Sequence, residues 1–137
     1  MDRDEVLAVI DAAYDARVRG DVAALGRLWA EGATYELAGE RTMLAALPNS
    51  AAGLAEPTVA ALAELVAFRS VERLETLVEG RGAAVVCRVA MAFGNREPVD
   101  TRLNHLWQLD EQGRIASLLE FGDTAMAVSE MVQLNGA

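Results

Sequence analysis

The sequence predicts an α+β fold in which N-terminal helices pack on a strongly curved, mostly antiparallel sheet. The first half of the chain shows helical spacing of apolar residues and helix caps, whereas the second half alternates polar and apolar residues between glycine-containing turns. A lone histidine, His105, lies on an otherwise apolar strand face. A curled sheet preceded by helices forms a cone around a pocket, and we expect His105 in its wall.

Length and charge narrow the functional classes. The 137 residues fit one domain over residues 1–137, and the net charge of -9 repels phosphate backbones and anionic lipids. Nucleic acid and membrane partners are therefore not expected. The single cysteine, Cys87, has no partner for a disulfide, and one histidine with scattered carboxylates indicates neither a metal site nor a cofactor. Because the start of the chain has no basic leader region and no apolar run of spanning length, we expect a cytoplasmic protein.

The first helix has readable ends. Asp2 and Glu5 have the spacing of a capping box, and Gly20 suits the left-handed residue that follows a helix. The first helix is therefore expected to reach about Arg19.

A second helix should follow at once. Asp21 can cap it, and the apolar spacing predicts that it buries Trp29 and stops at Gly32. Residues 33–37 favour a short strand because they include Thr and Tyr.

The next stretch is harder to interpret. Residues 39–57 mix helix formers with Pro, Gly, Asn and Ser, which indicates a loop with about one helical turn near residues 42–46. Thr58 can then cap a third helix over residues 59–68.

Four strand patterns joined by three hairpin turns complete the sheet, over residues 71–79, 83–93, 101–109 and 114–121. Asp123 can cap a last helix that reaches about Met131. In residues 101–109, His105 and Trp107 share the apolar, inner face.

The strand over residues 83–93 is nearly all apolar apart from Arg88, which predicts that both of its faces are covered. We expect the second cover to be another copy of the chain. The predicted homodimer forms across the outer face of the sheet through a row of apolar residues: Val85, Cys87, Val89, Met91 and Phe93.

Two segments resemble the nuclear transport factor 2-like superfamily, namely residues 13–37 (AYDARVRGDVAALGRLWAEGATYEL) and 104–124 (NHLWQLDEQGRIASLLEFGDT). The resemblance implies a cystatin-like cone that opens on a hydrophobic cavity. It carries the fold more specifically than the function.

Three enzyme groups of that superfamily give residue-level comparisons. Ketosteroid isomerases place a carboxylate base where this chain has Leu37, with Glu36 on the opposite side of the strand, and an acid where it has His105. Their helix tyrosine falls on Ala13, one residue before Tyr14.

In limonene epoxide hydrolases an Asp-Arg-Asp relay would correspond to Arg88 and Glu120, but Ala90 replaces one acid. SnoaL-like polyketide cyclases pair a histidine with an acid on the last strand, which His105 and Glu120 resemble most closely.

The resemblance implies a cofactor-independent isomerase, cyclase or dehydratase that enolises a small apolar carbonyl compound. His105 and Glu120 are the expected catalytic pair, with the pKa of Glu120 raised toward neutrality by a low-dielectric pocket. Five further residues are expected to bind substrate: Tyr14, Trp29, Tyr35, Arg88 and Trp107.

Other interpretations remain open at this level. His105 can instead donate to a backbone carbonyl in the core, Glu120 can pair with Arg88, and the tryptophans can serve only as core residues. The alternative function is a non-catalytic module of the same fold, either a ligand-binding pocket or a dimeric scaffold.

Overall fold

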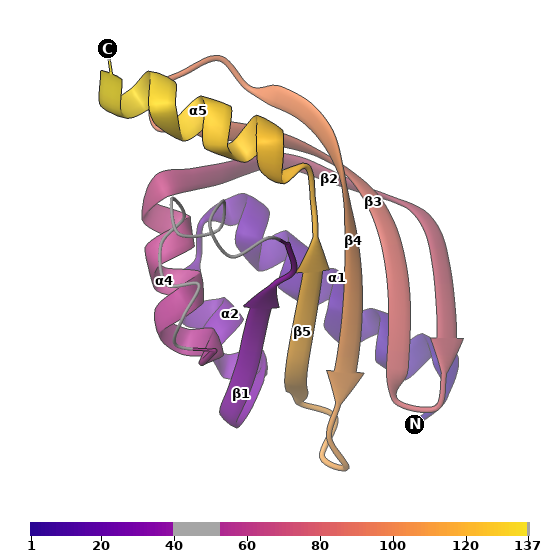
Figure 1. The fold of residues 1–137 in the computed structure, drawn as a ribbon. Coiled ribbons are helices and arrows are strands. Elements are labelled where there is room, and N and C mark those ends of the chain that lie inside the picture. The colour runs from indigo at the N-terminus through magenta and orange to yellow at the C-terminus, as the bar shows by residue number, and fades with distance from the viewer. Residues whose placement is uncertain (40–52, 137) are drawn as a thin grey trace.

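The computed structural model describes residues 1–39 and 53–136. Within this part of the chain the strands form one five-stranded sheet in the order β1-β5-β4-β3-β2, antiparallel except for the parallel pair β1 and β5. This is the predicted α+β class (Figure 1). In chain order the elements are α1 (Arg3–Arg19), α2 (Val22–Leu28), β1 (Trp29–Leu37), α4 (Ala55–Leu65), β2 (Val66–Glu79), β3 (Gly82–Phe93), β4 (Val99–Leu109), β5 (Ile115–Phe121) and α5 (Thr124–Gly136).

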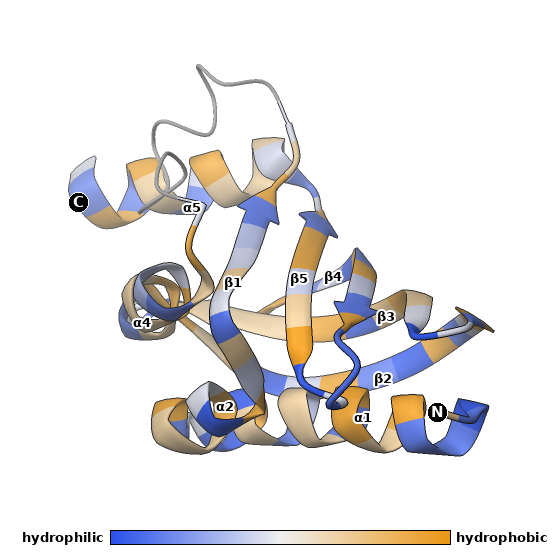
Figure 2. Ribbon diagram, turned by 90° about the horizontal axis from the view of Figure 1, so that it is seen from below, coloured by the Kyte–Doolittle hydropathy of each residue, from blue (hydrophilic) through white to orange (hydrophobic). Residues whose placement is uncertain are grey.

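The sheet is strongly curled, and α1 lies along its concave face (Figures 1 and 2). Helix α1 packs on α2 and β2, and α4 packs on β1, so that these helices close one side of the cone. The core lies between α1 and the sheet, where Val6, Ile10 and Ile115 are fully buried. None of the described helices is long and apolar enough to cross a membrane.

The predicted caps of α1 and α5 are confirmed. The Asp2 carboxylate accepts from the Glu5 amide (2.9 Å) while the Glu5 carboxylate accepts from the Asp2 amide (2.7 Å). Gly20 ends α1 with φ 68°, a left-handed conformation that favours glycine. Asp123 accepts from the Met126 amide at 3.0 Å at the start of α5.

The second helix is shorter than predicted. It ends at Leu28, and Trp29 is already extended and pairs in parallel with Ile115. Gly32, with φ 72°, lies in an irregularity between the paired residues Trp29 and Thr34, so β1 begins four residues before the predicted residues 33–37. The prediction was wrong because helical spacing of apolar residues cannot register a strand that starts with a bulge.

The third helix starts and ends earlier than predicted. It begins at Ala55 rather than after a Thr58 cap, and Pro57 lies in its first turn, where a missing amide hydrogen breaks no helical bond. It ends at Leu65, since Val66 pairs with Phe93 and already belongs to β2. The helical turn predicted near residues 42–46 lies outside the described residues.

The apolar row of β3 faces inward, which corrects the predicted dimer surface. In an antiparallel pair directly opposed residues share a face, and Val85 opposes His105 while Cys87 opposes Leu103. All five residues of that row are at most 9% exposed inside this single chain. Arg88 instead lies on the outer face, where it pairs with Glu72 at 3.6 Å.

Candidate functional site

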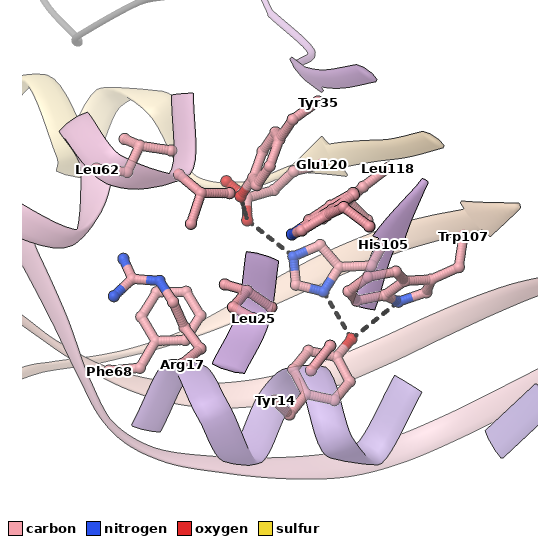
Figure 3. Close-up of a pocket in the computed structure, with 13 residues that line it drawn as sticks. Tyr14, Arg17, Leu25, Tyr35, Leu62, Phe68, His105, Trp107, Leu118 and Glu120 are labelled. Carbon is pink, nitrogen blue, oxygen red and sulfur yellow. Dashed lines mark hydrogen bonds and ion pairs between the residues drawn. The ribbon is translucent and has the colours of Figure 1, made fainter. Parts of the chain in front are cut away.

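Strand register brings His105 and Glu120 together. They are direct partners between β4 and β5, and Val85 on β3 continues the same row. The neighbouring row on this concave face contains Trp107 beside Leu118. Because opposed residues project to the same side of the sheet, both rows point toward the helices (Figure 3).

Five side chains form a continuous hydrogen-bonded chain. The Tyr14 hydroxyl lies 2.7 Å from His105 Nδ1, and His105 Nε2 lies 2.8 Å from Glu120 Oε1. Tyr35 donates its hydroxyl to the same Oε1 at 2.8 Å, and Trp107 donates its indole N–H to the Tyr14 oxygen at 3.3 Å. His105 is therefore no isolated core histidine, because both of its ring nitrogens have polar side-chain partners.

His105 and Glu120 form a buried ion pair. Burial opposes the charge on each residue, yet hydrogen bonds to Cys87 and Glu120 and the charge of Glu120 raise the pKa of His105 to about 9. For Glu120, burial acts to raise the pKa, but the hydrogen bond and charge of His105, the Tyr35 hydroxyl and Arg17 together lower it. The expected raised pKa of Glu120 is thus wrong in direction, because its partner is cationic.

This charge state decides what Tyr14 can donate. A doubly protonated His105 donates from Nδ1 to the Tyr14 oxygen, which also accepts from Trp107. The hydroxyl hydrogen of Tyr14 then bonds neither His105 nor Trp107, and the weakly accepting thiol of Cys87 competes with a ligand for it. Burial raises the pKa of Tyr14 well above its ordinary value, so this hydrogen stays in place at physiological pH.

Among the described residues, one oxygen of Glu120 has no hydrogen-bond partner. Both hydrogen bonds that Glu120 accepts from the described residues end on Oε1. Glu120 lines the pocket between the sheet and the helices and also borders a second hollow beneath α5. Within the described part of the chain, the carboxylate is therefore held through one oxygen, and no side chain occupies the other.

The pocket around this chain of side chains is mainly apolar. Its enclosed cavity volume is about 30 Å³, and the empty space rises to about 390 Å³ when open solvent at the mouth is included. The walls come from α1, α2, α4 and all strands except β3 (Figure 3). The lining residues are Ala13, Tyr14, Arg17, Leu25, Trp29, Tyr35, Val59, Leu62, Phe68, His105, Trp107, Leu118 and Glu120.

Six of the seven residues expected in the site line this pocket, and Arg88 does not. Trp29 packs its ring 6.4 Å from that of Trp107 and 6.3 Å from that of Tyr35, which gives one aromatic wall. Arg88 is directed away because its neighbours Cys87 and Val89 occupy the inward positions of β3. We do not retain it as a substrate-binding residue.

Arg17 is a pocket residue that the sequence interpretation missed. Its Nη2 donates to the Val66 carbonyl at 2.8 Å, and its guanidinium lies 4.2 Å from the centre of the Phe68 ring. The signal was present, because Val6, Ile10 and Tyr14 repeat at helical spacing and Arg17 continues that stripe. No group of three potential metal-ligating residues occurs in the described part of the chain.

Comparison with known proteins defines the class of fold. No family model matches the sequence, and no curated protein matches it. The chain has the nuclear transport factor 2-like fold, as its similarity to solved structures shows.

Three of these structures illustrate the range. A nuclear transport factor 2-like protein of unknown function from Burkholderia pseudomallei has a TM-score of 0.77 at 13% identity, covering 93% of this chain and 97% of that one. A limonene epoxide hydrolase-like enzyme from M. tuberculosis has a TM-score of 0.68 at 15% identity, covering 95% of this chain and 91% of that one. An epoxide hydrolase/cyclase-like enzyme with a role in pyran ring formation in the polyether salinomycin has a TM-score of 0.69 at 17% identity, covering 90% of this chain and 95% of that one.

Proposed function

We propose that this protein is a cofactor-independent enzyme that moves a proton at the α-carbon of a small, largely apolar carbonyl compound, as an isomerase, cyclase or dehydratase. The observation that carries the proposal is Glu120, which lines an apolar pocket and whose Oε1 is held by His105 and Tyr35, while its second oxygen has no hydrogen-bond partner among the described residues. A carboxylate held in this way is oriented as a base before substrate arrives.

In the proposed reaction the free oxygen of Glu120 takes the α-proton, and the bonding pair of that C–H becomes the enolate double bond. The negative charge moves to the carbonyl oxygen, which accepts a hydrogen bond from the Tyr14 hydroxyl. His105 contacts both residues, so its positive charge stabilises the carboxylate before the transfer and strengthens the Tyr14 donor during it. His105 is then a positioning residue rather than the base.

A base with a low pKa is compatible with this chemistry when the enolate oxygen is well stabilised, since an ordinary carboxylate serves where strong donors face the oxyanion. The pairing of β1 with β5 supports Glu120 as the base. Glu120 pairs with Leu37, the position at which the resemblance to ketosteroid isomerases puts their base. The carboxylate is thus supplied from the adjacent strand.

The test is catalysed hydrogen exchange. Wild-type protein in D2O is incubated with small apolar ketones such as phenylacetone, and loss of the α-proton signal is followed by proton NMR. We expect exchange above the buffer rate, and a loss of roughly 100-fold to 10,000-fold in Glu120→Gln. Glu36→Gln is the matched control, because Glu36 is the exposed carboxylate beside Tyr35 on β1. No exchange with any ketone, together with ligand binding, favours the non-catalytic pocket.

We also propose that two copies of the chain associate across the outer face of the sheet, through a different row from the one first predicted. Leu77, Ala84, Leu106 and Leu119 are successive register partners from β2 to β5. Leu77 is 75% exposed and Leu106 is 45% exposed, which is unusual for large apolar side chains in one row on the same face of a sheet. Burial of this row in a homodimer would remove it from water.

A further inference from the structure

Arg17 forms no ion pair with the described residues, although its charge helps to lower the pKa of Glu120. Its side chain is only partly exposed, and no carboxylate of the described residues lies within ion-pair distance of it. Its hydrogen bond to the described residues runs from Nη2 to the Val66 carbonyl. Burying a guanidinium is costly unless charge-bearing or strongly polar groups satisfy its other donors. The side chain nonetheless lines the pocket.

A second donor in the same lining is also unused. Trp29 is 6% exposed, and its indole nitrogen is the buried side-chain polar atom that takes no partner in the described structure. Buried N–H groups of tryptophan usually find an acceptor. The pocket therefore presents two donors, from α1 and β1, to whatever fills it.

The charges of the lining residues also favour an anionic ligand. Arg17 and the imidazolium of His105 contribute two positive charges, and Glu120 contributes one negative charge. An apolar enclosure with one surplus positive charge favours an anionic ligand, although the whole chain carries -9.

We propose that the ligand of this pocket is an acid, whose carboxylate binds the Arg17 guanidinium while another of its oxygens accepts from the Trp29 indole. The substrate class is then an enolisable oxo acid with an apolar skeleton. This inference rests on the proposed function only in taking the pocket as the substrate site. A planar guanidinium with free donors suits a carboxylate, which can accept from two of them.

The test compares an acid with its neutral isostere by isothermal titration calorimetry, using 3-phenylpropanoate and 3-phenylpropanamide. Neither compound has a ketone, so binding is measured apart from turnover. Wild-type protein is expected to bind the acid about tenfold or more tightly than the amide, as charge-assisted hydrogen bonds predict. Arg17→Gln should lose this preference and leave amide affinity within about threefold.

Arg88→Gln is the matched control, because it removes the same charge from the outer face and should keep the preference. Arg17→Lys retains the positive charge but lacks the planar guanidinium, so it should keep part of the preference for the acid over the amide. Equal affinities in the wild type, no binding of the acid at millimolar concentration, or a preference that persists in Arg17→Gln would each overturn the proposal. If Arg17→Gln does not fold, the wild-type comparison still decides. A carboxylate preference without α-proton exchange refutes the proposed catalysis and leaves the acid site standing.

Discussion

The titration of His105 depends directly on Glu120, and the perturbation that exposes this dependence is Glu120→Gln. The glutamine oxygen can still accept from His105 and Tyr35, so geometry is retained while the charge is removed. A rise in the pKa of His105 from 6.5 to about 9 corresponds to roughly 3 kcal/mol in favour of the imidazolium. Once the carboxylate charge is gone, burial should lower the midpoint by about two pH units or more.

The assay is a long-range proton–nitrogen NMR correlation of the imidazole, which is unambiguous because the chain has one histidine. Both nitrogens should be protonated in the wild type at neutral pH, with a midpoint near 9. Glu36→Gln should leave that midpoint unchanged. A wild-type midpoint at or below 6.5, or equal midpoints in the wild type and Glu120→Gln, would refute the ion pair.

The raised pKa of His105 also makes the stability of the fold depend on pH. Because the folded-state pKa of His105 is raised, its contribution to the free energy of unfolding is complete below pH 6.5 and is lost as the pH rises through about 9. The thermal midpoint of the wild type should fall over that range more than that of Glu120→Gln. Equal falls would contradict this origin.

Two further predictions concern Tyr14 and the outer face of the sheet. Tyr14→Phe should slow α-proton exchange roughly 100-fold to 1,000-fold, because the enolate oxygen loses its donor, and should lower the free energy of unfolding by about 1 to 3 kcal/mol as His105 and Trp107 lose a partner; exchange at the wild-type rate would remove Tyr14 from the mechanism. Leu106→Glu should convert a dimer into a folded monomer in sedimentation at micromolar concentration, whereas Val89→Asp should unfold the chain because Val89 is fully buried. A monomeric wild type, or a dimer unaffected by Leu106→Glu, would contradict the proposed interface.

Sequence patterns predicted the parts of the fold in which polar and apolar residues alternate clearly. On β4 the alternation put His105 and Trp107 inward, and they are 2% and 4% exposed. The α1 caps were equally readable, because capping requires particular residues at fixed spacing. On β3 the nearly continuous apolar run shows no such alternation, and the row that starts at Val85 was wrongly predicted to face outward. Arg88 marks the outward positions, and only pairing with β4 settles which row is inside.

Most residues of the candidate site were predicted from the sequence, but their charge states were not. Strand pairing in a meander explains why His105 and Glu120 meet. The hydrogen bond between His105 and Tyr14 requires α1 to cross the sheet at this point, which local spacing does not determine. The direction of the Glu120 pKa depends on the same long-range contacts. Arg17 was missed because a basic residue at the end of an apolar stripe usually reaches solvent.

The pH profile of α-proton exchange tests the central claim most directly, because it separates a carboxylate base from a histidine base. If Glu120 is the base and His105 must be protonated, the buffer-corrected rate should be constant through neutral pH. It should fall below pH 4.5 as the lowered pKa of Glu120 is passed, and fall again above about pH 9. A rate that instead rises as His105 loses its proton would show that the imidazole takes the α-proton and would contradict the account.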